Sequence, residues 1–305
     1  MKHRTRHTAA APVVLGVALF LALTAVPAAA GIDGIEVTGT IDLYARADYV
    51  SSADGASILI WGLTDGDRAQ YPAPTLIVNQ GETIYITLHN DLGVNAADTS
   101  LVFPGHDVHG GSGFCSPDEP VPGDASSRIT CEASAEQAAP NPVALAVPAT
   151  YSFVAEKAGT YMYHSGTDPA LQVEMGILGA IVVRPYGYDS INPAAYGHPD
   201  TAFDREYLFI LSEMDSRIHE AVDFNESLEG TDFLGDYFAN YWFINGRTAP
   251  DTLAGAHVPW LPTQPYNILP QMLPGERVLM RVVSAGRDPH PYHHHGNHAL
   301  IIGRN

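Results

Sequence analysis

The sequence has few cysteines and few basic residues, and long helical periodicity is absent from it. Its 305 residues include 2 Cys, and 15 Lys and Arg stand against 34 Asp and Glu, which gives a formal net charge of −19. A surface this acidic disfavours binding to nucleic acid and to anionic membranes. Hydrophobic residues still make up 46% of the chain, which is enough for packed cores.

The first thirty residues have the pattern of an export signal. Basic residues at positions 2–6 precede an apolar run at 12–26, and alanines at 28–30 precede Gly31. The run is too short for a spanning helix, and no second run of this kind follows. We therefore predict that residues 1–30 are cleaved and that the protein is periplasmic or extracellular, with no membrane attachment after cleavage. The alternative is a retained N-terminal anchor.

Both cysteines lie in a stretch of low regularity. Residues 112–142 are rich in Ser, Pro, Ala and Asp, which predicts an insertion loop, placed within 105–148. In an oxidising compartment, Cys115 and Cys131 are expected to form one disulfide, which would stabilise the fold by about 3 kcal/mol. A copper thiolate is the alternative, although neither cysteine stands in a His-Cys-His sequence.

The rest of the chain reads as short strands joined by turns. An Asn-Gln-Gly-Glu turn at 79–82 leads into an alternating strand at 83–88, and a Gly-Glu turn at 275–276 leads into an apolar strand in the same way. Antiparallel strands with Gly- and Pro-rich turns favour β-sandwiches. We predict an all-β protein with two tandem domains, residues 31–186 and 187–305, the second incomplete at its C-terminus.

Two local features are expected in the second domain. Residues 218–222 are predicted to form a short helix, and Asn245-Gly246 is a strong turn signal. Glu213 and Asp215 lie close enough in sequence to approach a metal together, but in so acidic a chain we expect both carboxylates to be solvated. Tyrosines beside the candidate ligands, such as Tyr163, are expected to be half-buried.

Histidines gather near position 290: His290, His293, His294, His295 and His298. Successive side chains of a strand point to opposite faces, so His293 and His295 are predicted to share one face and His294 the other. Pro291 biases His290 toward an extended conformation. Two imidazoles on one face with a third upstream suit copper or zinc.

The apolar run at 299–302 follows Gly296 and predicts a strand that enters a core. The alternative for the whole stretch is a histidine-rich surface strand without a metal.

The segment His290-Pro291-x-His293-x-His295-Gly296 resembles the His-Pro-x-His-x-His-Gly motif of multicopper oxidases. The resemblance implies that His290 binds a type 1 copper and that His293 and His295 bind the type 2 and type 3 coppers of a cluster that reduces dioxygen. Residues 74–92 resemble the first cupredoxin domain of that family. The implied fold is therefore two tandem cupredoxin-like Greek-key sandwiches, and the implied cofactor is copper.

Other family motifs are altered. Val102 and Pro104 stand where the family has two copper histidines, and Gly166 stands where it has a third. Within Tyr161-Met162-Tyr163-His164, only His164 matches a type 3 copper ligand. A lone histidine beside tyrosines is also common as a packed, hydrogen-bonded residue.

The loop after Pro104 carries two further histidines. His106 and His109 offer a displaced metal site, with His298 as another weak candidate. The alternative for the loop is a polar segment with two exposed histidines.

The resemblance implies an oxidase that removes single electrons from a phenolic or metal-ion donor and passes them to dioxygen. A type 1 centre needs a thiolate, and no cysteine follows residue 131. We therefore expect this activity only in a longer or assembled form, with a homo-oligomer as one way to pool ligands, and a naturally short protein as the alternative to a fragment. Two other hypotheses remain open. The protein could sequester copper without being an enzyme, or it could be a structural module whose metal sites have been lost.

Overall fold

The regular structure of the chain is almost entirely β, as predicted. The computed structural model describes residues 31–92, 98–110, 133, 147–226, 228, 236–296 and 298–304. The predicted export signal, both cysteines and most of the predicted insertion loop lie outside these ranges. Within them, no helix has the length and apolar character that crossing a membrane requires.

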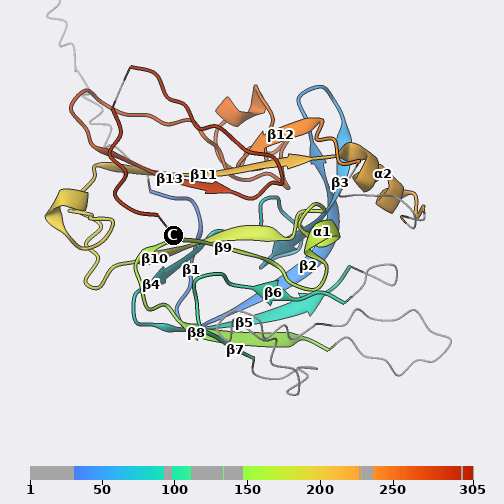
Figure 1. Ribbon diagram of the computed structural model, residues 1–305, viewed down its shortest axis with the longest axis horizontal. Helices are drawn as coiled ribbons and strands as arrows, with labels where there is room; N and C mark the ends of the chain where they lie inside the picture. Colours follow the sequence, from blue (N-terminus) through green and yellow to red (C-terminus); the bar gives the residue numbers. More distant parts are fainter. Residues whose placement is uncertain are drawn as a thin grey trace, which may run out of the picture.

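Ten strands form two five-stranded sheets (Figure 1). The first sheet has the spatial order β1 (Ile35–Glu36), β4 (Leu76–Asn79), β10 (Leu178–Arg184), β9 (Gly159–Ser165) and β6 (Leu101–Val102). The second has the order β3 (Ser57–Thr64), β2 (Thr40–Ser51), β5 (Thr83–Asn90), β8 (Ala149–Val154) and β7 (Val108–Gly110). Together they make a β-sandwich.

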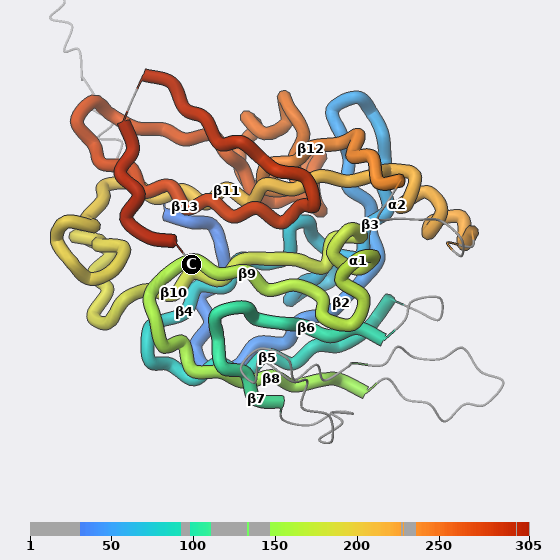
Figure 2. Tube along the Cα trace, viewed as in Figure 1, coloured from blue at the N-terminus to red at the C-terminus, as the bar shows by residue number. Residues whose placement is uncertain are grey.

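A third, three-stranded sheet lies over the first sheet. Its order is β12 (Tyr241–Ile244), β11 (Arg205–Met214) and β13 (Val278–Ser284). The short helices are α1 (Pro169–Gln172), η1 (Pro199–Thr201), α2 (Ser216–Asp223) and η2 (Asp251–Leu253). Figure 2 shows the resulting stack, with the C-terminal part of the chain on one side of the sandwich.

Several strand pairs are parallel, which corrects the antiparallel expectation. Strand β4 runs parallel to β1 and β10, β2 runs parallel to β5, and β11 runs parallel to β13. Parallel neighbours need long crossover connections, whereas antiparallel ones can share a tight turn. Local turn signals therefore located the strands but did not determine their partners.

Two apolar clusters hold the layers together. In β5, Ile84, Ile86 and Leu88 are fully buried and point into the cluster between the two sandwich sheets. Their alternation with more exposed neighbours is the period of a strand with one face in a core. A second cluster, which includes Leu178 and Ile210, joins the first sheet to the third.

A buried ionic group also links the first and third sheets. Glu206 on β11 accepts hydrogen bonds from Arg184 on β10 at 2.7 Å and from Arg281 on β13 at 2.6 Å. All three side chains are less than 10% exposed. Removing one partner from such a group is costly, because it leaves an uncompensated buried charge.

The local features predicted for the second domain are present. The helix α2 covers the predicted residues 218–222, and its N-cap Asp215 accepts from the Arg217 amide. Asn245 and Gly246 both have positive φ, at 51° and 76°, in a turn closed by hydrogen bonds between Ile244 and Arg247. Positive φ at both central residues is what a type I′ turn requires.

Candidate metal-binding site

After β13 the chain forms a segment, residues 286–296 and 298–304, which we call the C-terminal strap. None of these described residues has regular secondary structure, so the strand predicted here is not formed in them. The apolar run does not enter a core either, since Leu300 is 81% exposed and Ile301 is 65% exposed. The pattern was wrong because a strand needs a hydrogen-bonded neighbour, and no strand in the described residues pairs with the strap.

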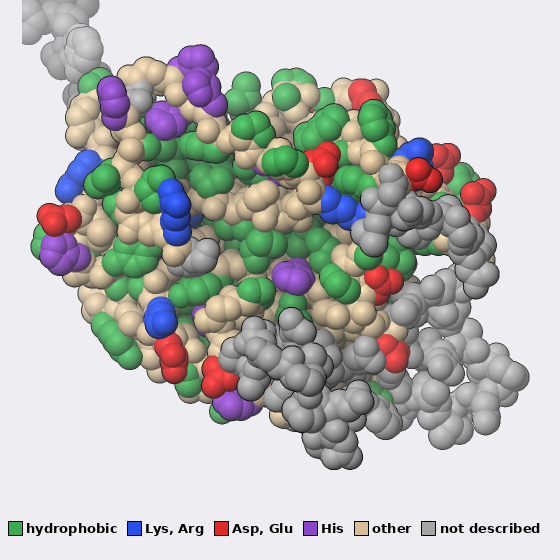
Figure 3. Space-filling model, in the orientation of Figure 1, with side chains coloured by type: hydrophobic (Ala, Val, Ile, Leu, Met, Phe, Trp, Pro, Cys, Tyr) green, Lys and Arg blue, Asp and Glu red, His purple; other side chains and the backbone are tan. Residues whose placement is uncertain are grey.

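The strap nevertheless brings two of the predicted ligands together. The rings of His293 and His295 lie edge to face, with centroids 4.5 Å apart. His294 instead contacts the ring of Tyr292, at 6.0 Å. Histidine side chains gather over this part of the chain in the space-filling view (Figure 3). The pairing of positions 293 and 295, without 294, matches the sequence prediction, and His298 is exposed nearby.

The third predicted ligand, His290, is held by a residue of the third sheet. Its Nε2 lies 2.5 Å from Oε2 of Glu213, a buried carboxylate on β11. In the tautomer in which Nε2 donates to this carboxylate, Nδ1 is the ring nitrogen that can bind a metal. A carboxylate is one of the groups that commonly accept from the second ring nitrogen of a metal-bound histidine.

Other contacts fix the strap on either side of the histidines. The Tyr292 hydroxyl donates to Sδ of Met280 at 2.8 Å, and its ring lies 6.3 Å from that of Phe209. Gly303 packs against the ring of Tyr196, where a Cβ atom would collide.

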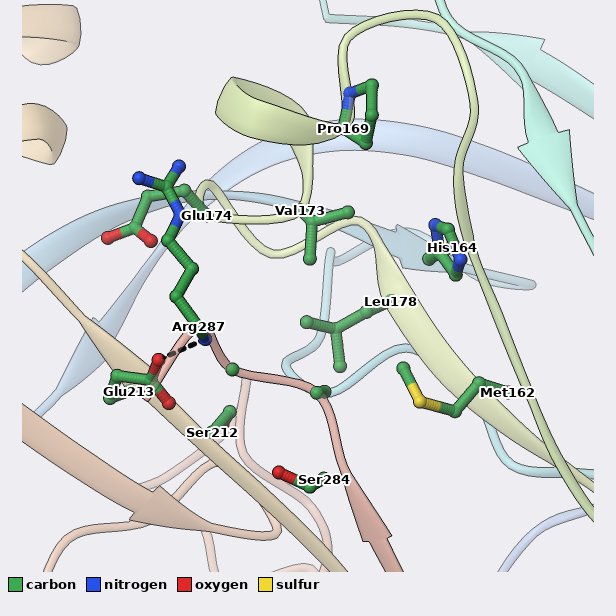
Figure 4. A pocket seen from close by; sticks show the side chains of 12 residues that line it. Met162, His164, Pro169, Val173, Glu174, Leu178, Ser212, Glu213, Ser284 and Arg287 are labelled. Atoms are coloured by element: carbon green, nitrogen blue, oxygen red, sulfur yellow. Dashed lines mark hydrogen bonds between the residues drawn. The ribbon is translucent and has the colours of Figure 1, made fainter. Parts of the chain in front are cut away.

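A cavity of about 270 Å³ lies between the first sheet and the third (Figure 4). One wall comes from β9, α1 and β10, with His164 and Leu178, and the other comes from β11 and the start of the strap, with Glu213 and Arg287. His164 is half-buried, and its Nδ1 lies 2.8 Å from the Ser165 carbonyl. This contact is that of a packed, hydrogen-bonded residue. Its neighbour Tyr163 is completely buried, not half-buried as expected.

The two weaker candidates in the β6–β7 loop are in different environments. His106 is 5% exposed and packs between the rings of Phe153 and Tyr161, each 4.4 Å away. Burial lowers its pKa to about 4. His109 is exposed. The prediction that both histidines of this loop are exposed is therefore wrong for His106, because the rings of Phe153 and Tyr161 cover it.

The described residues offer donors of the kind that copper prefers, but they do not bring together enough of them for a complete centre. Imidazole nitrogens suit copper. No group of three or more His, Cys, Asp or Glu side chains in the described ranges is arranged to hold a metal. A complete mononuclear centre takes three or four protein ligands. The strap thus presents a pair of ligands, and the described part of the chain does not assemble a full copper centre.

The burial of Glu213 was not predicted from the sequence. We expected it to be solvated, but it is 4% exposed. The available signal was its place in the strongly apolar run Tyr207–Met214, most of which is buried. Asp215 is likewise buried, as the helix cap described above.

Comparison with known proteins gives limited matches. No protein-family model matches the chain. The iron transport multicopper oxidase FET3 of Gibberella zeae is 31% identical over 119 residues, which are 39% of this chain and 16% of that protein. The structure of a blue copper oxidase from Nitrosomonas europaea is similar with a TM-score of 0.51 at 16% identity, covering 82% of this chain and 62% of that one. The structure of a copper nitrite reductase from the same organism is similar with a TM-score of 0.49 at 21% identity. The similarity covers 84% of this chain and 70% of that one.

The similarity to the blue copper oxidase shows the fold: the sandwich is cupredoxin-like. With the curated match, it supports a chain that is multicopper-oxidase-like over part of its length. The chain spans less than two thirds of either of these two proteins.

Proposed function

We propose that this chain is an exported copper-binding protein of the multicopper-oxidase type, whose C-terminal strap supplies copper ligands. The observation that carries the proposal is the facing pair of His293 and His295. The carboxylate partner of His290 supports it, and so does the partial similarity to a multicopper oxidase.

In its complete form the protein would couple one-electron oxidation of a donor to reduction of dioxygen. Bound copper would supply the redox chemistry, and the strap would supply imidazole ligands. A type 1 centre also needs a thiolate beside its histidines, and the described residues include no cysteine. The remaining ligands would come from another copy of the chain or from further polypeptide.

The direct test is titration of the purified protein with Cu(II) at neutral pH. His293→Ala and His295→Ala are each expected to weaken binding, because each removes half of the pair. His294→Ala is the matched control, since it removes an imidazole from between them and leaves the pair intact. Equal loss in all three variants, or no binding by the wild-type protein, would contradict the proposal.

A second candidate is a non-enzymatic copper-sequestering protein. The absence of a three-ligand group from the described ranges favours it, because two imidazoles can capture copper without forming an oxidase centre. Oxygen consumption separates the two functions. An oxidase consumes oxygen with a phenolic donor or with Fe(II), the latter tested because the curated relative is an iron transport oxidase. A sequestering protein binds copper and consumes none.

A further inference from the structure

Glu213 is a buried carboxylate in the third sheet. It lies near the end of β11, opposite Trp242 of β12, and its side chain is completely inaccessible. Burying a carboxylate is unfavourable unless hydrogen-bond donors replace the lost water. The donors around Glu213 therefore show what this charge organises.

Its donors include three from a single stretch of four residues. The backbone amide of Asp288 donates to Oε1 at 2.8 Å, and the amide of Arg287 donates to the same oxygen. Nε2 of His290 lies 2.5 Å from Oε2. Successive backbone amides that converge on one anion form a concave binding site for it. The carboxylate thus holds the strap at the point where it leaves β13.

Gly286 adds an independent steric observation. A Cβ atom at this position would overlap the carboxylate of Glu213. The close approach of strap and sheet is possible only because residue 286 has no side chain. The carboxylate, the two amides and the glycine together define how the strap begins.

We infer that Glu213 is a positioning residue for metal capture. By fixing residues 286–290, it sets the path of the strap and presents His293 and His295 to the same ion. This inference rests on the proposed function, since it concerns the same copper-binding pair. Glu213 acts through the strap and is not itself a ligand.

The matched control is Glu206, which lies seven residues earlier on the same strand. It is also a buried carboxylate, but it accepts from Arg184 and Arg281 and has no bond to the strap among those described. Glu206→Gln also removes a buried, hydrogen-bonded charge, and none of the described partners of Glu206 lies in residues 286–290. It separates a loss of general stability from a loss of strap position.

The experiment measures Cu(II) affinity and thermal unfolding for the wild-type protein, Glu213→Gln, Gly286→Ala and Glu206→Gln. Partners that orient metal-bound histidines typically contribute tenfold to a hundredfold in affinity, so Glu213→Gln and Gly286→Ala are expected to weaken binding by about that factor. Glu206→Gln is expected to lower the unfolding temperature and leave the affinity unchanged. Glu213→Gln removes charge whereas Gly286→Ala adds a methyl group, so agreement between them identifies the position of the strap as the cause.

Two outcomes would overturn the inference. Wild-type affinity in both strap variants would show that the strap holds its path without Glu213. Equal weakening by Glu206→Gln would show that the effect is general destabilisation. Failure of the proposed function is distinct from both, because then the wild-type protein itself would not bind copper.

Discussion

The β-sandwich and the C-terminal strap contain similar residues in opposite environments. In β5, Ile84 and Leu88 are completely buried between two sheets, whereas Leu300 and Ile301 in the strap are mostly exposed. Each apolar run has the composition of a strand. The first has neighbours β2 and β8 on its two sides, and the second pairs with no strand in the described residues.

The difference shows what an apolar pattern requires before it becomes a core strand. Backbone amides and carbonyls must be paired when they are buried, so a run without a neighbour stays at the surface. The strap is instead held by side chains, above all by Glu213, and its histidines 293, 295 and 298 lie at the surface. The same contrast predicts where substitutions will be felt.

The largest effect is expected in the sandwich core. Phe153 is 1% exposed and packs against Phe103, with ring centroids 5.3 Å apart. Phe153→Ala should lower the free energy of unfolding by about 3–5 kcal/mol, because it leaves a cavity. Leu300→Ala, in the strap, should change it by less than about 0.5 kcal/mol. Denaturant unfolding measures both, and a comparable loss for Leu300 would show that the strap is packed in solution.

Buried His106 should make folding stability depend on pH, and exposed His109 provides the comparison. Burial holds the pKa of His106 at about 4 in the folded protein, below the ordinary imidazole value of about 6.5. The unfolded chain therefore binds a proton first as pH falls, and folding stability should decrease between about pH 6.5 and 4, by roughly 3 kcal/mol from this residue.

His106→Phe keeps the aromatic contacts with Phe153 and Tyr161 and removes the proton site, so its stability should fall less steeply across this range. The exposed His109→Gln is the control and should follow the wild-type profile. Parallel curves for wild type and His106→Phe would refute the assignment.

A smaller effect tests how the third sheet meets the sandwich. Gly246 and Gly275 both have positive φ, at 76° and 93°. An added Cβ at Gly246 would collide with the Tyr71 carbonyl, whereas nothing lies within 4 Å of one at Gly275. Alanine at either site incurs the left-handed backbone strain, and Gly246→Ala should cost about 1–3 kcal/mol more, from overpacking. Equal unfolding free energies would place the turn away from the sandwich.

Much of the local structure could be predicted from the sequence. The alternation in residues 83–88, the helix around Ile218 and the Asn245-Gly246 turn all depend on neighbours within a few positions. Such features survive because backbone geometry alone brings these side chains together or separates them. The contact between His293 and His295 agrees with the predicted grouping, but strand alternation does not produce it, because no strand forms among the described residues there.

The environment of each candidate site could not be predicted in this way. Neither the aromatic wall around His106 nor the donors around Glu213 lie next to those residues in sequence. Strand partners were also missed, since the parallel pairing of β11 with β13 joins segments about seventy residues apart. Burial and hydrogen bonding of this kind depend on long-range packing, for which the local pattern carries no signal.

Residue type and local pattern were enough to show that the chain is acidic and β-rich, and they led us to predict a metal site from the spacing of its histidines. The folded chain was needed to show that His106 is buried, that His290 is bonded to a carboxylate and that the rings of His293 and His295 face each other. The physical reason is that residue type and spacing fix what a side chain can do, whereas solvent, neighbouring charge and a partner strand are supplied by distant parts of the chain. Glu213 illustrates this: its carboxylate is evident at position 213, but its hold on residues 287–290 exists only in the fold.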